Sequence, residues 1–133
     1  MEFIRADWQW DRDAPMCAAV RTGDFLWLTG MTAIGDDGEV VGVGNLQAQA
    51  RQVFANIGHV LSKAGGELAS VIRLTNYFAI PLNPDVAEEY WQVRREVFGD
   101  HHPASTGVQV VGLLRPEMML EIDAVAYLPS TAA

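Results

Sequence analysis

Two carboxylates, Glu121 and Asp123, stand two positions apart in the apolar stretch from Met118 to Leu128. The stretch alternates as a β-strand does, and residues two apart on a strand project from the same face of the sheet. Such a pair has two interpretations: a solvated sheet face, or a cleft in which one carboxylate handles protons or water. For Asp123 we prefer the solvated face, and for Glu121 both interpretations stay open.

Two adjacent hydroxyls, Ser105 and Thr106, begin the preceding stretch, Ser105 to Leu113, whose β-branched residues and glycines predict another strand. A turn at Arg115–Pro116 joins the two strands. Neither a Ser-His-Asp order nor a Gly-x-Ser-x-Gly elbow surrounds the hydroxyls, so hydrogen bonding to a ligand explains them better than nucleophilic attack.

Metal and thiol chemistry find little support. His101 and His102 are adjacent, and adjacent side chains rarely converge on one ion; no Cys-His spacing accompanies them. The single cysteine, Cys17, has no local general base and is predicted to be a small packed residue. We therefore predict no metal site and no disulfide.

The composition predicts one domain, residues 1–133, large enough to bury a core. Its 9 Lys and Arg against 17 Asp and Glu give a net charge of −8, which argues against nucleic-acid binding. Because there is no run of about 18 apolar residues, we expect no membrane span. The charged, tryptophan-containing first residues lack the apolar core of a signal peptide, so we expect a cytoplasmic protein.

The pattern predicts strands that alternate with helices. The strands are expected at residues 17–21, 25–29, 39–43 (a short edge strand), 70–80, 105–113 and 118–128, and residues 1–15 are expected to be irregular. Asn45 caps a helix that ends at Gly65-Gly66, and Asn83-Pro84-Asp85 starts a second helix that ends at Gly99.

This order predicts an α+β fold, a single sheet covered on one face by two helices. In the strand 70–80, one face is expected to hold Ile72, Leu74, Asn76, Phe78 and Ile80. The uncovered sheet face is not fully polar, since Tyr77 and Val125 lie on it. Burial against a partner subunit is the natural solution.

Taken together, these stretches resemble the RidA family, also called YjgF or L-PSP-like proteins. The resemblance covers nearly the whole chain: Ala14-Pro15, Leu28-Thr29-Gly30, the helix 49–66, the strand 70–80, Pro103-Ala104 and the strand 120–126. It implies a homotrimer whose subunits each have a mixed six-stranded sheet with two helices on one face, and ligand clefts between adjacent subunits.

The resemblance also implies hydrolysis of reactive enamines and imines, such as 2-aminoacrylate, to keto acids and ammonia, without metal or organic cofactor. The glutamate of the last strand, here Glu121, positions water or shuttles a proton. An arginine directly after Pro-Ala holds the substrate carboxylate, and here Ser105 stands in its place. Serine cannot form the bidentate ion pair. At roughly 1.5 to 3 kcal/mol per hydrogen bond to a charged group, carboxylate binding should weaken by about two orders of magnitude.

Other cleft positions also depart from the family pattern. A tyrosine is replaced by Met16, a cysteine by Gly107 and a second-helix asparagine by Trp91. We expect a cleft that is wider near residue 107, less cationic and more apolar. Arg73 and Arg115 are candidates to replace the lost guanidinium.

Three functions are weighed. The first is a cofactor-independent hydrolase or deaminase of small imine-, enamine- or amide-like metabolites. The second is a non-catalytic binding or regulatory trimer, and the third is an L-PSP-type endoribonuclease, against which the net charge argues. The candidate site consists of catalytic Glu121 and the substrate-binding residues Met16, Thr29, Gly30, Trp91, Ser105, Thr106 and Gly107.

Overall fold

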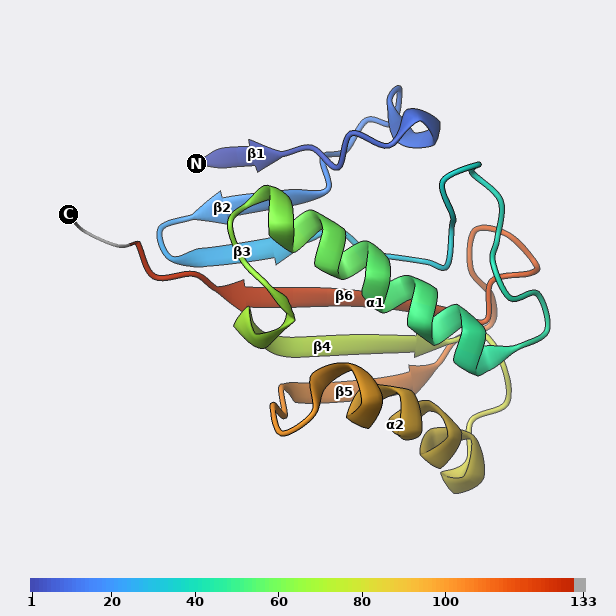
Figure 1. Cartoon of the computed structure of the whole chain (residues 1–133). Helices are drawn as coiled ribbons and strands as arrows, with labels where there is room; N and C mark the ends of the chain where they lie inside the picture. The colour runs from blue at the N-terminus through green and yellow to red at the C-terminus, as the bar shows by residue number, and fades with distance from the viewer. Residues whose placement is uncertain (131–133) are drawn as a thin grey trace.

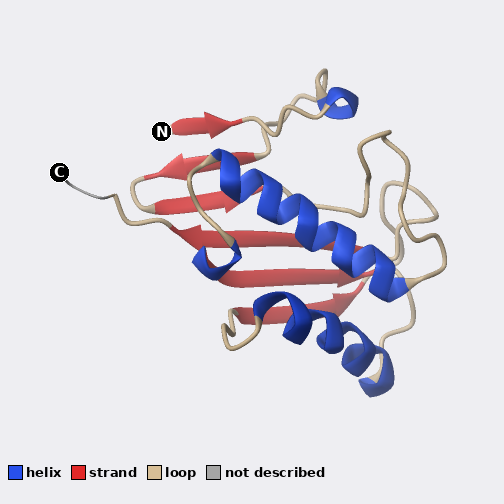
Figure 2. Cartoon of the chain, in the orientation of Figure 1, coloured by secondary structure: helices blue, strands red, loops and turns tan. Residues whose placement is uncertain are grey.

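The computed structural model describes residues 1–130; the last three residues of the predicted domain, 131–133, lie outside the described residues. The chain has an α+β fold, with one mixed six-stranded sheet and both helices on the same face (Figures 1 and 2). The strands are β1 (Glu2–Ile4), β2 (Ala19–Thr22), β3 (Phe25–Leu28), β4 (Val71–Phe78), β5 (Ala104–Gln109) and β6 (Leu120–Tyr127). The helices are α1 (Leu46–Lys63) and α2 (Pro84–Phe98), with short 3-10 turns at Gln9–Asp11 and Leu68–Ser70.

Both helices begin where the sequence predicts. The Asn45 side chain accepts a hydrogen bond from the Ala48 N–H at the start of α1, and the Asn83 side chain accepts one from Val86 at the start of α2. These caps satisfy backbone donors that have no partner within the helix. Gly99 ends α2 with a φ of 60°, a conformation that glycine adopts without strain.

The strand order is β1-β2-β3-β6-β4-β5. The β4–β5 pair is parallel, because α2 carries the chain back across the sheet between them, and the other neighbours are antiparallel. The core lies between the sheet and the helices, where Phe54 of α1 packs against Tyr90 and Phe98 of α2. The central strand β6 therefore has one buried face and one face that no helix covers (Figure 1).

The predicted number of strands is correct, but one strand is misplaced. The structure has a strand at Glu2–Ile4, in the segment expected to be irregular, and β1 pairs with β2 there. The edge strand expected at residues 39–43 is wrong: only an isolated bridge joins Ile34 and Val40. Gly38 and Gly42 adopt φ angles of 81° and 79°, which end any extended run between them.

Two further strand predictions needed correction. The strand expected to run to Leu113 ends at Gln109, because its partner β4 ends at Phe78, the residue paired with Gln109. In β4 the alternation is right from Leu74 onward, with Leu74, Asn76 and Phe78 buried. A bulge between Val71 and Arg73 reverses it earlier, so Val71 is buried and Ile72 is exposed.

The uncovered sheet face carries an aromatic cluster formed by Phe25, Trp27 and Tyr127. Ring centroids lie 6.4 Å apart for Phe25 and Trp27, and 5.6 Å apart for Phe25 and Tyr127. All three side chains are exposed in the single chain, Trp27 by 51%. Within the described residues 1–130, neither helix has the length and apolar character that crossing a bilayer requires.

Candidate functional site

Glu121 lies on β6 beside Tyr77 of β4 and faces away from the helices, since its neighbours Leu120 and Ile122 are buried on the helix side. Its half-buried carboxyl group lines a cavity of about 420 Å³, which we call the Glu121 pocket. The residues around it are largely apolar: Trp8, Trp10, Met16, Thr29, Gly30, Met31, Leu114 and Met118 among them. Four predicted site residues, Met16, Thr29, Gly30 and Glu121, thus meet here.

The segment after β3 holds the Glu121 carboxyl group in place. The Thr29 hydroxyl donates to the Cys17 carbonyl, with 2.9 Å between the oxygens. Met31 and Ile122 exchange backbone hydrogen bonds of 2.8 and 2.9 Å, which lay the segment along β6. Gly30 then passes so close that an added β-carbon would lie 2.8 Å from Oε2 of Glu121. Glycine is therefore needed at position 30 for the carboxyl group to occupy this place.

Burial raises the pKa of the Glu121 carboxyl group, and the nearby negative charge of Asp123 raises it further. Asp123 lies on the same face and accepts a hydrogen bond from the Tyr77 hydroxyl at 3.1 Å, a bond that raises the pKa of Tyr77. Within residues 1–130, nothing donates a hydrogen bond to the Glu121 carboxylate. A carboxyl group with a raised pKa and open lone pairs is suited to accept and return protons.

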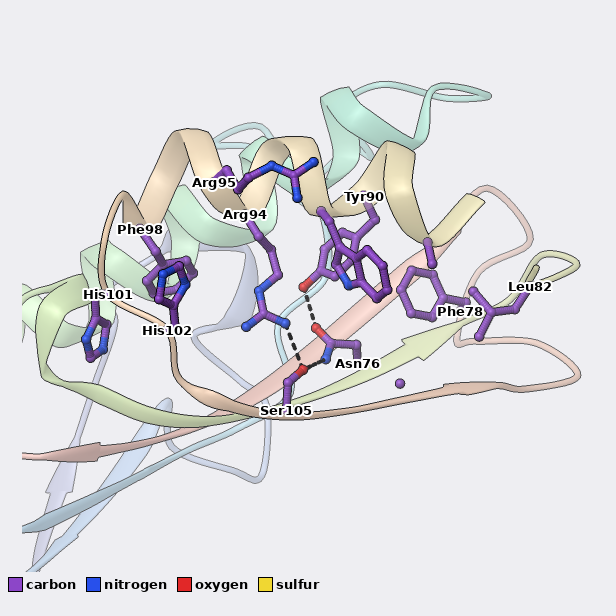
Figure 3. A pocket seen from close by; sticks show the side chains of 13 residues that line it. Asn76, Phe78, Leu82, Tyr90, Arg94, Arg95, Phe98, His101, His102 and Ser105 are labelled. Atoms are coloured by element: carbon purple, nitrogen blue, oxygen red, sulfur yellow. Dashed lines mark hydrogen bonds between the residues drawn. The ribbon is translucent and has the colours of Figure 1, made fainter. Parts of the chain in front are cut away.

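A second cavity, of about 500 Å³, lies between α2 and β5, and we call it the α2–β5 pocket. Its lining includes three other predicted site residues, Ser105, Gly107 and Trp91. Figure 3 shows the pocket with Ser105 labelled. Ser105 of β5 points toward α2, on the opposite side of the sheet from Glu121. All predicted site residues except Thr106 therefore divide between two pockets of the single chain.

A hydrogen-bond network connects the floor of the α2–β5 pocket to its wall (Figure 3). The Tyr90 hydroxyl donates to Oδ1 of Asn76, and burial raises the pKa of that hydroxyl. Nδ2 of Asn76 donates to Oγ of Ser105 at 2.9 Å and to the Thr106 carbonyl at 2.7 Å. Nη1 of Arg94 also donates to Oγ of Ser105, at 2.7 Å.

Sequence reasoning missed Arg94, Asn76 and Tyr90 as site residues. The signal was present in two places: Arg94 follows Tyr90 by four positions, which puts both on one face of α2, and Asn76 interrupts the apolar face of β4. Arg94, Arg95, His101 and His102 all line the α2–β5 pocket.

The remaining predicted residues lie elsewhere. The Thr106 side chain faces the uncovered sheet side, where its hydroxyl accepts a hydrogen bond from Arg73 at 2.6 Å. Arg115 donates to the Gly38 carbonyl at 2.9 Å, between two loops. Neither arginine reaches Ser105 in the single chain. Among residues 1–130, no group of three or more His, Cys, Asp and Glu side chains is placed to hold a metal ion.

Comparison with known proteins agrees with this architecture. Residues 11–128 match the family model described as Endoribonuclease L-PSP. The 3-aminoacrylate deaminase RutC of Acinetobacter baylyi is 34% identical over 118 residues, which is 86% of this chain and 87% of that protein. A RutC family protein of Pyrococcus horikoshii is 37% identical over 114 residues, 85% of this chain and 86% of that protein.

Solved structures are also similar to this chain. A Mycobacterium tuberculosis member of the YjgF/YER057c/UK114 family is 27% identical, with a TM-score of 0.78 over 96% of this chain and 98% of that one. RidA from a Psychrobacter species, 23% identical, shares the fold with a TM-score of 0.84, over 96% of this chain and 100% of that one. With the match to the family model over residues 11–128, these findings show that the chain belongs to the RidA/YjgF/L-PSP family.

Proposed function

We propose that this protein is a cofactor-independent deaminase that hydrolyses small imine- and enamine-like metabolites, with Glu121 as the catalytic residue. The observation that supports it best is the Glu121 carboxyl group, half-buried in an apolar pocket, with a raised pKa and open lone pairs. Its relative RutC from Acinetobacter baylyi, 34% identical, is a deaminase of an enamine.

The proposed reaction needs only water and one carboxyl group. The Glu121 carboxylate accepts a proton from a water molecule whose oxygen adds to the carbon of the C=N bond, and this proton passes to the nitrogen. In the resulting carbinolamine, Glu121 moves the hydroxyl proton to the nitrogen, the C–N bond breaks, and ammonia leaves a carbonyl product. An enamine enters after a proton moves from its nitrogen to its β-carbon.

We further propose that the two pockets combine across the interface of a homotrimer. In one chain, Glu121 and Ser105 face opposite sides of the sheet, so a small ligand cannot touch both. The exposed aromatic cluster of Phe25, Trp27 and Tyr127 on the uncovered sheet face supports burial against another copy. A neighbouring subunit would then bring its α2–β5 pocket opposite the Glu121 pocket.

The test compares Glu121→Gln with Glu39→Gln, a variant that removes an exposed carboxylate outside both pockets. With 2-aminoacrylate generated in situ, we expect Glu121→Gln to release ammonia about 10²- to 10⁴-fold more slowly and Glu39→Gln to match the wild type. Unchanged turnover in Glu121→Gln would exclude this residue from the mechanism. A wild type that binds small imines without consuming them would support the non-catalytic alternative.

A further inference from the structure

The α2–β5 pocket carries a charge opposite to that of the whole chain. The protein has a net charge of −8, yet the residues lining this pocket include two arginines and two histidines and no Asp or Glu. Arg95 is paired with Glu88. Within residues 1–130, Arg94 forms no ion pair, and this half-buried residue lines the pocket.

The directions of the three hydrogen bonds made by Asn76 follow from one acceptor. The Thr106 carbonyl can only accept, so the group of Asn76 that faces it must be the Nδ2 amide. Oδ1 of Asn76 therefore faces Tyr90, whose hydroxyl is the donor. The second Nδ2 hydrogen then goes to Oγ of Ser105.

The Ser105 hydroxyl can therefore only donate a hydrogen bond to a ligand. A serine oxygen has two lone pairs, and here Asn76 uses one and Arg94 uses the other. The Ser105 hydroxyl hydrogen must therefore point away from both, and the guanidinium of Arg94 has further N–H donors besides the one that Ser105 accepts. Arg94 is further held over the Tyr90 ring, with its guanidinium carbon 5.9 Å from the ring centroid. Two adjacent donors, one of them charged, match the two oxygens of a carboxylate.

We propose that Arg94 and Ser105 form a carboxylate-binding pair that selects carboxylated substrates. This inference rests on the proposed function in one respect: the bound carboxylate would place the C=N bond near Glu121 of an adjacent subunit. The guanidinium comes from Arg94 of α2. Ser105 of β5 accepts a hydrogen bond from it, and the Ser105 hydroxyl is the second donor to the carboxylate. The substrate class is then a short-chain imino or enamino acid, in preference to its amide or ester.

The test measures binding apart from turnover. Dissociation constants for pyruvate and for pyruvamide, which differ in one carboxylate, are determined by calorimetry for the wild type, Arg94→Met and Ser105→Ala. We expect the wild type to prefer pyruvate. Arg94→Met should lose about tenfold or more in pyruvate affinity, with pyruvamide affinity unchanged. Arg51→Gln, which removes a guanidinium outside both pockets, is the matched control and should bind like the wild type.

Two outcomes would contradict the proposed carboxylate-binding pair. They are equal affinity of the wild type for pyruvate and pyruvamide, or an Arg94→Met variant that binds pyruvate as the wild type does. If Arg94→Met does not fold, the guanidinium Nε–H resonance of Arg94 in the wild type decides, since it must shift with pyruvate and not with pyruvamide. Failure of the proposed pair can be distinguished from failure of the proposed function. Glu121→Gln should lower turnover and leave pyruvate affinity unchanged, whereas Arg94→Met should lower pyruvate affinity.

Discussion

Gly30 and Glu121 touch so closely that a methyl group at position 30 would lie 2.8 Å from Oε2 of Glu121 and 3.0 Å from its carboxyl carbon. We predict that Gly30→Ala displaces the Glu121 carboxyl group and lowers turnover about tenfold or more, because a shift of about 1 Å misplaces a catalytic group. Gly112→Ala is the control, since a β-carbon there meets nothing within 4 Å. Equal turnover in both variants would show that the Gly30 contact does not position Glu121.

The raised pKa of Glu121 predicts a pH dependence of stability. Burial and Asp123 disfavour the charged carboxylate in the folded protein, so the folded state binds a proton more readily than the unfolded state, whose pKa is near 4.5. Stability contributed by the protonated form is present below about pH 4.5 and is lost as the pH rises through the raised folded pKa.

Glu121→Gln removes this ionisation and should therefore raise the melting temperature at pH 7 relative to the wild type, with a smaller difference at pH 4. Thermal unfolding of both proteins across this range measures the effect. A difference that does not change with pH would mean that the carboxyl group titrates alike in the folded and unfolded states.

Asn76 is 1% exposed and joins Tyr90, Ser105 and Thr106. We predict that Asn76→Ala destabilises the chain by about 2 to 4 kcal/mol, because it leaves the Thr106 carbonyl and the buried Tyr90 hydroxyl without partners. Gln92→Ala, which removes an exposed hydrogen bond to Gln47, should cost about 0.5 kcal/mol or less. Denaturant unfolding compares the two, and similar costs would contradict a buried network at Asn76.

Trp27 tests the proposed homotrimer. Trp27→Lys places a charge in the exposed aromatic cluster and should shift the solution mass from a trimer toward a single chain of 14.6 kDa. Val43→Lys introduces the same charge at another exposed apolar residue, in the connection between β3 and α1, and should leave the assembly unchanged. A wild type that already sediments as a single chain would refute the trimer.

The fold could be predicted from the sequence because its signals are local. The caps at Asn45 and Asn83, and the glycine at the end of α2, each act within one helical turn, and the structure confirms all three. The three-residue strand β1 could not be predicted, since so short a segment shows no alternation and is defined only by its pairing with β2. The β4 bulge likewise depends on the register with β6.

Local signals also explain which residues of the candidate site could be named from the sequence. Glu121 is a charged residue in an apolar strand, and Gly30 directly follows a predicted strand, so both can be recognised from the sequence alone. The contact between Arg94 and Ser105 cannot be recognised in this way. It joins a helix to a strand, and its geometry depends on how α2 crosses β5. Arg73 and Arg115 were the predicted replacements for the lost guanidinium, and Arg94 on the helix above was not among them.

The Phe54–Phe98 contact, with its rings nearly perpendicular at 87°, joins α1 to α2 and has a consequence for the α2–β5 pocket. Arg94 reaches Ser105 from α2, and this aromatic contact helps to fix the position of α2 beside α1. Substitutions at Phe54 or Phe98 can therefore shift Arg94 relative to Ser105, and with it the proposed binding of a carboxylate, without changing any residue that lines the contact.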